Sequence, residues 1–184
     1  VPNRISPSAN PMIERLVGAL TEEIYEAGAG GMPWGPVGQG LIRLVGAGSG
    51  SLFLVNPAEG EDSVLFRGDL PLEAEARYRR YYRSVDLWTA RAGQAAARRG
   101  AGAAPLVSRS GTLVPDAEYA GSEFYADFGR QLGLRYVVGT VLPLGQAGYM
   151  PIGLHRPEGM ENFGTAEADL LSRLLPHLRR SMQI

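Results

Sequence analysis

The feature that most constrains the fold is a pair of apolar, β-favouring segments near the C-terminal end of the chain. The segments Leu134–Leu142 and Gly148–Arg156 both alternate in hydrophobicity, which is typical of strands. The connection between them contains the short turn Gly145–Gly148, which is bounded by glycines. We therefore expect an antiparallel hairpin. Pro151 cannot donate to a strand ladder, and it therefore predicts that the second strand is an edge strand or is bulged at that point.

A second strand pair and several helices are expected before and after this hairpin. The segment Ser51–Val55 and its expected antiparallel partner Val64–Arg67 have strand composition. Helical periodicity or composition predicts helices at Ile13–Ala27, Trp34–Val45, from Pro71 onward, Leu87–Arg99, Ala117–Leu132 and from Thr165 onward. Hairpins without strand–helix–strand alternation imply an α+β fold, with helices packed on an antiparallel β-sheet.

The chain is long enough for one domain with a substantial core. Residues 1–11 contain three prolines and are expected to form a flexible N-terminal segment, leaving 12–184 as a single domain. The net charge of −1 gives no electrostatic argument for direct nucleic-acid binding. No apolar segment approaches membrane-spanning length and the N-terminal residues do not resemble a signal peptide, so a cytoplasmic location without a membrane partner is expected.

The sequence offers little that is suited to catalysis. It has no cysteine, which excludes disulfides and thiolate chemistry. Its two histidines, His155 and His177, each stand in an apolar context without metal-ligand spacing, where packing is the commoner role. The glycine-rich segment Gly46–Gly50 leads into a strand, the wrong order for a dinucleotide-binding loop. We therefore expect no catalytic residues, no metal site, no cofactor and no enzymatic activity.

The segment Arg77–Trp88 concentrates aromatic side chains around one carboxylate. On a helix, Tyr78 and Tyr82 would share one face, with Asp86 at its far end. Two interpretations remain open. An aromatic wall with one polar group suits a pocket for a small molecule. Alternatively, Asp86 caps the next helix and the tyrosines belong to an ordinary core.

Three longer segments resemble a known family. They are YYRSVDLW, SEFYADFGRQLGLRYVVGTVLPLGQAGYMPIGLHRP and FGTAEADLLSRLLPHLRRSM. Together they resemble the N-terminal sensor region of LuxR-type helix-turn-helix transcriptional regulators. The resemblance covers most of the chain after residue 12. It implies a PAS/GAF-like, autoinducer-binding-like antiparallel sheet between helical layers.

The resemblance also implies roles for individual residues. In the acyl-homoserine-lactone receptors of this family, the aspartate at the place of Asp86 holds the ligand amide and aromatic residues line the acyl cavity. By that resemblance Tyr78, Asp86 and Phe124 face a ligand and Trp88 lies next to it. Tyr82 completes the set of expected ligand-binding residues.

The sequence departs from the lactone receptors at several positions. Leu87 stands where the family has proline after the aspartate, and Glu73 and Asp69 stand where it has tryptophan and tyrosine. No serine equivalent occurs near Leu154. These departures predict a different small apolar or amphipathic signal molecule.

The resemblance predicts a regulatory domain that senses a ligand and acts on DNA only through a helix-turn-helix region absent from this sequence. Apolar stripes on the first and last helices predict a homodimer. The alternative function is a ligand-free module for dimerisation or protein interaction, with a filled core.

Overall fold

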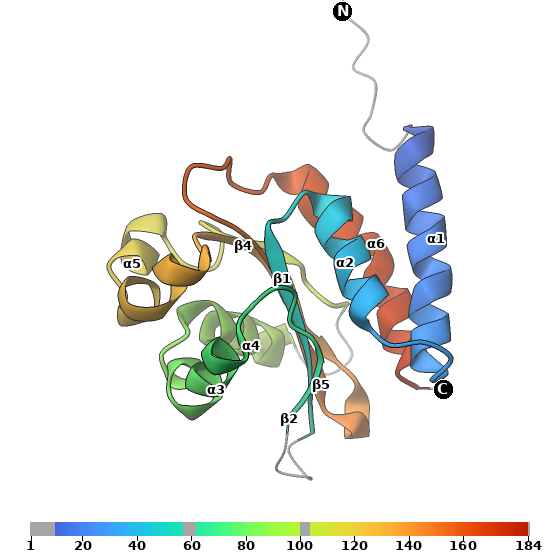
Figure 1. Cartoon of the computed structure of the whole chain (residues 1–184), viewed down its shortest axis with the longest axis horizontal. Coiled ribbons are helices and arrows are strands. Elements are labelled where there is room, and N and C mark those ends of the chain that lie inside the picture. The colour runs from blue at the N-terminus through green and yellow to red at the C-terminus, as the bar shows by residue number, and fades with distance from the viewer. Residues whose placement is uncertain (1–9, 57–61, 100–103, 184) are drawn as a thin grey trace, which may run out of the picture.

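The computed structural model describes residues 10–56, 62–99 and 104–183. Its centre is a five-stranded antiparallel sheet with the strand order β2-β1-β5-β4-β3. The strands are β1 (Ser49–Val55), β2 (Asp62–Phe66), β3 (Ser108–Arg109), β4 (Tyr136–Pro143) and β5 (Tyr149–Arg156). Helices cover both faces of the sheet, as Figure 1 shows. The α+β class predicted from the sequence is therefore confirmed.

The predicted C-terminal hairpin is the centre of this sheet. Strands β4 and β5 pair from Tyr136 opposite Arg156 to Pro143 opposite Tyr149. Strand β5 also pairs with β1, so of the two alternatives predicted from Pro151 the edge strand is excluded. The β1–β5 ladder is instead interrupted beside Pro151, because proline has no N–H to donate.

One face of the sheet is covered by three helices that carry the larger apolar core. They are α1 (Pro11–Gly28), α2 (Gly35–Val45) and α6 (Thr165–Ser181), which lie together on one side in Figure 1. Ile24, Leu41 and Leu174 of these helices are fully buried. They belong to the same cluster as Leu142 and Leu154 of the central hairpin. The helical stripes read from the sequence thus pack against the sheet of their own chain.

The start of the chain differs slightly from the prediction. Residues 1–9 of the expected flexible segment lie outside the described residues. Asn10 already caps α1, since its side-chain oxygen accepts a hydrogen bond from the Met12 N–H at 3.0 Å. Pro11 then occupies the first helical position, where its missing N–H costs nothing. Nowhere in the described ranges is a helix long and apolar enough to cross a membrane.

Shorter helices cover the other face of the sheet and bring most aromatic side chains together. The elements are α3 (Leu72–Arg80), the 3-10 turn η2 (Tyr82–Ser84), α4 (Leu87–Arg99), α5 (Asp116–Ala120), the π-helical turn η3 (Tyr125–Gly129) and the 3-10 turn η4 (Arg130–Leu132). A second cluster of buried residues, which includes Trp88, Tyr119, Phe124 and Phe128, forms beneath them. This layer lies opposite α1, α2 and α6 in Figure 1.

The aromatic helix expected from Pro71 does not continue to Asp86. It ends at Arg80, and Tyr81 adopts a non-helical conformation with its side chain 48% exposed. Asp86 caps α4, and because an N-cap residue does not itself have helical dihedral angles, no helix can run through Asp86 into α4. Periodicity alone cannot reveal such a break.

The single helix expected at Ala117–Leu132 is also divided. α5 ends after one turn, and Ser122 stands at the interruption. Its hydroxyl donates to the Tyr119 carbonyl at 2.6 Å and accepts from the Tyr125 N–H at 3.2 Å. Serine thus offers the backbone an alternative to helical hydrogen bonds and separates α5 from η3.

Candidate functional site: a cavity between the sheet and the aromatic layer

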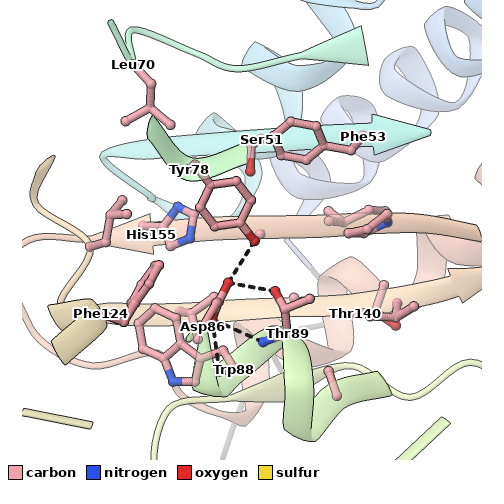
Figure 2. A pocket seen from close by; sticks show the side chains of 18 of the residues that line it. Ser51, Phe53, Leu70, Tyr78, Asp86, Trp88, Thr89, Phe124, Thr140 and His155 are labelled. Atoms are coloured by element: carbon pink, nitrogen blue, oxygen red, sulfur yellow. Dashed lines mark hydrogen bonds between the residues drawn. The ribbon is translucent and has the colours of Figure 1, made fainter. Parts of the chain in front are cut away.

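A cavity of about 110 Å³ lies between the second face of the sheet and the layer that contains α3 and α4. Figure 2 shows side chains from both layers around it. A buried water needs only about 10–15 Å³ of such space. The cavity is therefore large enough for several waters or for part of a small organic molecule.

The floor of the cavity is formed by two glycines on neighbouring strands. Gly139 of β4 and Gly153 of β5 face one another in the ladder, and both line the cavity. A Cβ atom at Gly139 would lie 2.2 Å from the Ile152 carbonyl oxygen, and one at Gly153 would lie 3.1 Å from the His155 ring. The pair exposes bare backbone where side chains would otherwise fill the space. Glycine inside a strongly patterned strand is the sequence signal that could have indicated this floor.

Three of the expected aromatic residues, Tyr78, Trp88 and Phe124, line the cavity. The rings of Tyr78 and Phe124 meet edge to face, with their centroids 6.3 Å apart. Phe53 of β1 and Phe128 of η3 complete the aromatic wall and were missed by the sequence analysis. Their position beside the other aromatic residues cannot be seen in the sequence, because only the folded sheet brings these distant segments together.

Tyr82 is not among the residues that line the cavity. Because α3 ends at Arg80, Tyr82 lies on η2 and not on the continuous stripe that the sequence suggested. Its ring stacks on Phe128 with the centroids 4.5 Å apart, and its hydroxyl accepts a hydrogen bond from Arg77 at 3.3 Å. Tyr82 therefore packs against the cavity-lining residue Phe128 without lining the cavity itself.

Asp86 unites the two interpretations that the sequence left open. Its Oδ1 accepts hydrogen bonds from the backbone N–H groups of Trp88 at 3.0 Å and Thr89 at 3.2 Å, so it caps α4. Its Oδ2 accepts from the Tyr78 hydroxyl at 2.9 Å and from the Thr89 hydroxyl at 2.7 Å. The residue is buried and lines the cavity, and Figure 2 shows these bonds joining Tyr78 of α3 to the start of α4.

Asp86 is a buried carboxylate, and its surroundings alter its pKa and that of Tyr78. Burial raises the pKa of Asp86, although the hydrogen bonds from Thr89, Tyr78 and the Trp88 N–H oppose that effect. Burial, together with the nearby Asp86 charge, also raises the pKa of the Tyr78 hydroxyl well above its usual value. None of the ion pairs found among the described residues includes Asp86. Neutral donors alone therefore stabilise its charge.

His155 is a further polar residue of the cavity. It is 8% exposed, and its Nδ1 has no hydrogen-bond partner within the described parts of the chain. Burial lowers the pKa of His155 to about 4, so the ring is neutral at physiological pH. The Nε1 of Trp88, whose ring stacks on His155 with the centroids 6.2 Å apart, lacks a partner among these residues as well. The sequence analysis treated His155 as a packing residue, since a lone histidine gives no signal of its own.

The arrangement suits the binding of a small, mostly apolar molecule. Apolar atoms of aromatic and aliphatic residues form most of the surface, and few polar atoms reach it, which is the composition of typical ligand pockets. In the described ranges no group of three or more His, Cys, Asp or Glu side chains gathers to hold a metal ion.

Comparison with known proteins places this geometry in context. No family model matches the sequence, and a search of curated proteins returns no match. Solved structures do match. The LBD domain of VqsR from Pseudomonas aeruginosa has a TM-score of 0.61 at 15% identity, over 95% of this chain and 96% of that one. The fold is that of a LuxR-type ligand-binding domain.

Two further structures share the LuxR-type ligand-binding fold. The N-acylhomoserine lactone dependent LuxR family transcription factor CepR2 from Burkholderia cenocepacia has a TM-score of 0.52 at 16% identity, over 91% of this chain and 92% of that one. SdiA in complex with octanoyl-rac-glycerol has a TM-score of 0.50 at 17% identity, over 93% of this chain and 61% of that one. At these identities the likeness establishes the shared fold.

Proposed function

We propose that this chain is a small-molecule-sensing regulatory domain of a LuxR-type transcriptional regulator. The observation that carries the proposal is the cavity with aromatic walls and a floor formed by Gly139 and Gly153. A filled core would serve a purely structural module better, because empty space removes packing contacts and lowers stability. The LuxR-type fold supports the same conclusion.

In this proposal Tyr78, Trp88 and Phe124 contact the ligand, and Asp86 fixes the geometry of the wall they form. The ligand is a small apolar or amphipathic molecule, because the walls are mainly aromatic and aliphatic. SdiA is in complex with an acylglycerol and CepR2 depends on an N-acylhomoserine lactone. Molecules with an acyl chain and a compact polar group are therefore the first class to test.

The ligand would act on the rest of the regulator through the sheet. Gly139 and Gly153 line the cavity on one face. Their neighbours Val138 and Leu154 pack in the core that contains α6 on the other. A ligand that binds two arrangements of these strands with different affinities shifts the equilibrium between them. In a full regulator α6 would pass that shift to a DNA-binding region.

A thermal-shift screen of acylated and other amphipathic metabolites tests the proposal. A ligand present at about one hundred times its Kd is expected to add about 2.7 kcal/mol to the free energy of unfolding. The location of binding is tested with Ala92→Leu, which places a larger side chain on a cavity-lining position of α4. Ala97→Leu is the matched control, since Ala97 is an exposed position of the same helix.

We expect an active compound to stabilise the native chain and the Ala97→Leu variant, but not Ala92→Leu. If no compound stabilises the native chain and Ala92→Leu simply raises the melting temperature, the cavity is a packing defect. The ligand-free dimerisation or interaction module would then be the better description of this domain.

A further inference from the structure

Four of the cavity residues form a row across the sheet. Ser51 of β1 stands opposite Gly153 of β5. Gly153 stands opposite Gly139 of β4, which in turn stands opposite Ser108 of β3. Residues directly opposite one another in a ladder project from the same face of a sheet. All four line the cavity, so its glycine floor is bordered by a serine on each side.

The hydroxyl groups of these two serines are available to a ligand. Neither hydroxyl has a hydrogen-bond partner among the described residues, and both oxygen atoms keep accessible surface. Ring nitrogens of Trp88 and His155 and the Nη1 of Arg67 also lack partners there, but these atoms have almost no accessible surface. A ligand in the cavity can therefore reach the serines more readily than these nitrogens.

Other polar side chains of the cavity wall are already engaged. The hydroxyls of Tyr78 and Thr89 donate to Asp86. The hydroxyl of Thr140 donates to the Leu106 carbonyl at 2.8 Å. A ligand would have to break one of these bonds to use the groups that form it, whereas Ser51 and Ser108 require no such exchange.

The register of the sheet sets the distance between the two serines. Three inter-strand spacings of about 4.8 Å separate them, so their Cα atoms lie about 14 Å apart. A hydrogen bond joins two oxygens that are about 2.8 Å apart. Two ligand oxygens that lie between the serines, each bonded to one of them, are therefore about 8–9 Å from one another.

The space between the serines is open on the side of Ser51. A Cβ atom at Gly153 would lie 3.8 Å from the Ser51 Oγ, so this hydroxyl borders the space that the missing side chain leaves. Figure 2 shows the side chain of Ser51 among those around the cavity. The rings of Tyr78 and Phe124 line the same cavity and offer apolar contacts to whatever lies over the glycines.

We propose that Ser51 and Ser108 form hydrogen bonds to the two ends of the ligand. The ligand carries an oxygen-bearing polar group at each end of a short apolar segment, which lies across Gly139 and Gly153. This inference rests on the proposed sensing function and deepens it. A serine hydroxyl both donates and accepts, so it pairs with a hydroxyl, a carbonyl or a carboxylate oxygen.

Two isomeric probes test the inference. In extended 1,6-hexanediol the two oxygens have about the required separation, whereas 1,2-hexanediol has the same atoms but both hydroxyls at one end. Dissociation constants are measured for each probe by NMR titration at pH 7. We expect 1,6-hexanediol to bind about fivefold more tightly, the effect of one additional neutral hydrogen bond. Apolar contact alone would favour the 1,2-isomer, because its alkyl end is uninterrupted.

Serine variants locate the two bonds. Ser51→Ala and Ser108→Ala should each weaken 1,6-hexanediol about fivefold, and the double variant about 25-fold, because sites this far apart act independently. Each single variant should change the affinity for 1,2-hexanediol less than about twofold, since that probe can use the remaining serine. The preference for the 1,6-isomer should disappear in the double variant.

Two controls separate contact from a general structural effect. Neither hydroxyl bonds to another described residue, so the variants should keep the native midpoint of urea denaturation. Ser63→Ala changes an exposed serine of β2 that does not line the cavity and should leave both affinities unchanged.

Several outcomes overturn the inference. They are equal binding of the two isomers, loss of the whole preference through one serine alone, a Ser63→Ala effect as large as the others, or no binding of 1,6-hexanediol. The sensing function itself is judged by the broader metabolite screen, so it can stand when this assignment of hydrogen bonds fails.

Discussion

At the scale of single residues, Asp86 shows how one carboxylate serves both folding and the cavity. The sequence placed an N-cap and a pocket residue in competition, because each interpretation used the same spacing. The structure assigns Oδ1 to the start of α4 and Oδ2 to Tyr78 and Thr89. The dual role was not predictable, since it depends on where the chain turns between α3 and α4.

Replacement of Asp86 separates these contributions. Asp86→Asn keeps a good capping side chain and should cost less than about 1 kcal/mol in the free energy of unfolding. Asp86→Ala removes the cap and leaves the buried hydroxyl of Tyr78 without its acceptor, which should cost at least about 2 kcal/mol. Urea denaturation measures both values. Equal losses for the two variants would show that the cap contributes little.

His155 predicts a dependence of stability on pH. Its pKa is lowered to about 4 in the folded chain, against about 6.5 when unfolded. The unfolded state therefore binds more protons in this window, and stability is lost as the pH falls from about 6.5 to 4. The loss amounts to about 3 kcal/mol. Urea denaturation across this range should show it for the native chain and for the control His177→Gln, but not for His155→Gln.

The raised pKa of Asp86 acts in the opposite direction in acid, because it favours the folded state as that carboxyl takes up a proton. This contribution is common to the native chain and both histidine variants, so it cancels when their curves are compared. A His155→Gln curve as steep as that of the native chain would contradict the assignment of the effect to His155.

At the scale of elements, the sequence predicted those features that depend on local pattern. Alternation identified the β4–β5 hairpin, and composition identified α4 with the bounds that the structure has. Tyr82 was misplaced because α3 ends at Arg80, and periodicity does not show where a helix ends. The cavity floor was missed because Gly139 and Gly153 become neighbours only through the register of the ladder.

Glycine substitutions test the floor directly. Gly139→Ala places a methyl group against the backbone oxygen of Ile152, which cannot move aside, and should cost about 2 kcal/mol or more in the free energy of unfolding. Gly153→Ala meets only side-chain atoms, those of the His155 ring and the Ser51 hydroxyl, and should cost less. Gly93→Ala on α4 meets nothing within 4 Å and should stabilise the chain by about 0.5–1 kcal/mol. Chemical denaturation of the three variants gives the order, and a Gly139→Ala loss no larger than that of Gly153→Ala would contradict it.

At the scale of the whole molecule, the two faces of the sheet differ in kind. The core beneath α1, α2 and α6 is built from buried aliphatic side chains, whereas the layer with α3 and α4 encloses the cavity. Amide hydrogen exchange should therefore be slowest in α1, α2 and α6 and faster in α3 and α4, because local opening follows local packing. A ligand of the cavity should slow exchange chiefly in α3 and α4. Uniform slowing across both faces would argue against binding in the cavity.

The homodimer remains a prediction. The apolar stripes that suggested it, represented by Ile24 and Leu174, are buried in the core of their own chain and are not free for a partner. Any dimer would have to use other surfaces of α1 and α6. Sedimentation at increasing concentration tests this, and a monomer throughout the range would exclude self-association as part of the mechanism.

The shared carboxylate of Asp86 has a consequence for how such a domain can change during evolution. The same side chain lines the cavity and caps α4, so on the proposed function a mutation of Asp86 would alter ligand selectivity and the stability of the fold together. On that proposal, divergence towards new ligands would proceed more easily through residues such as His155, which lines the cavity, caps no helix and has a ring Nδ1 without a hydrogen-bond partner among the described residues.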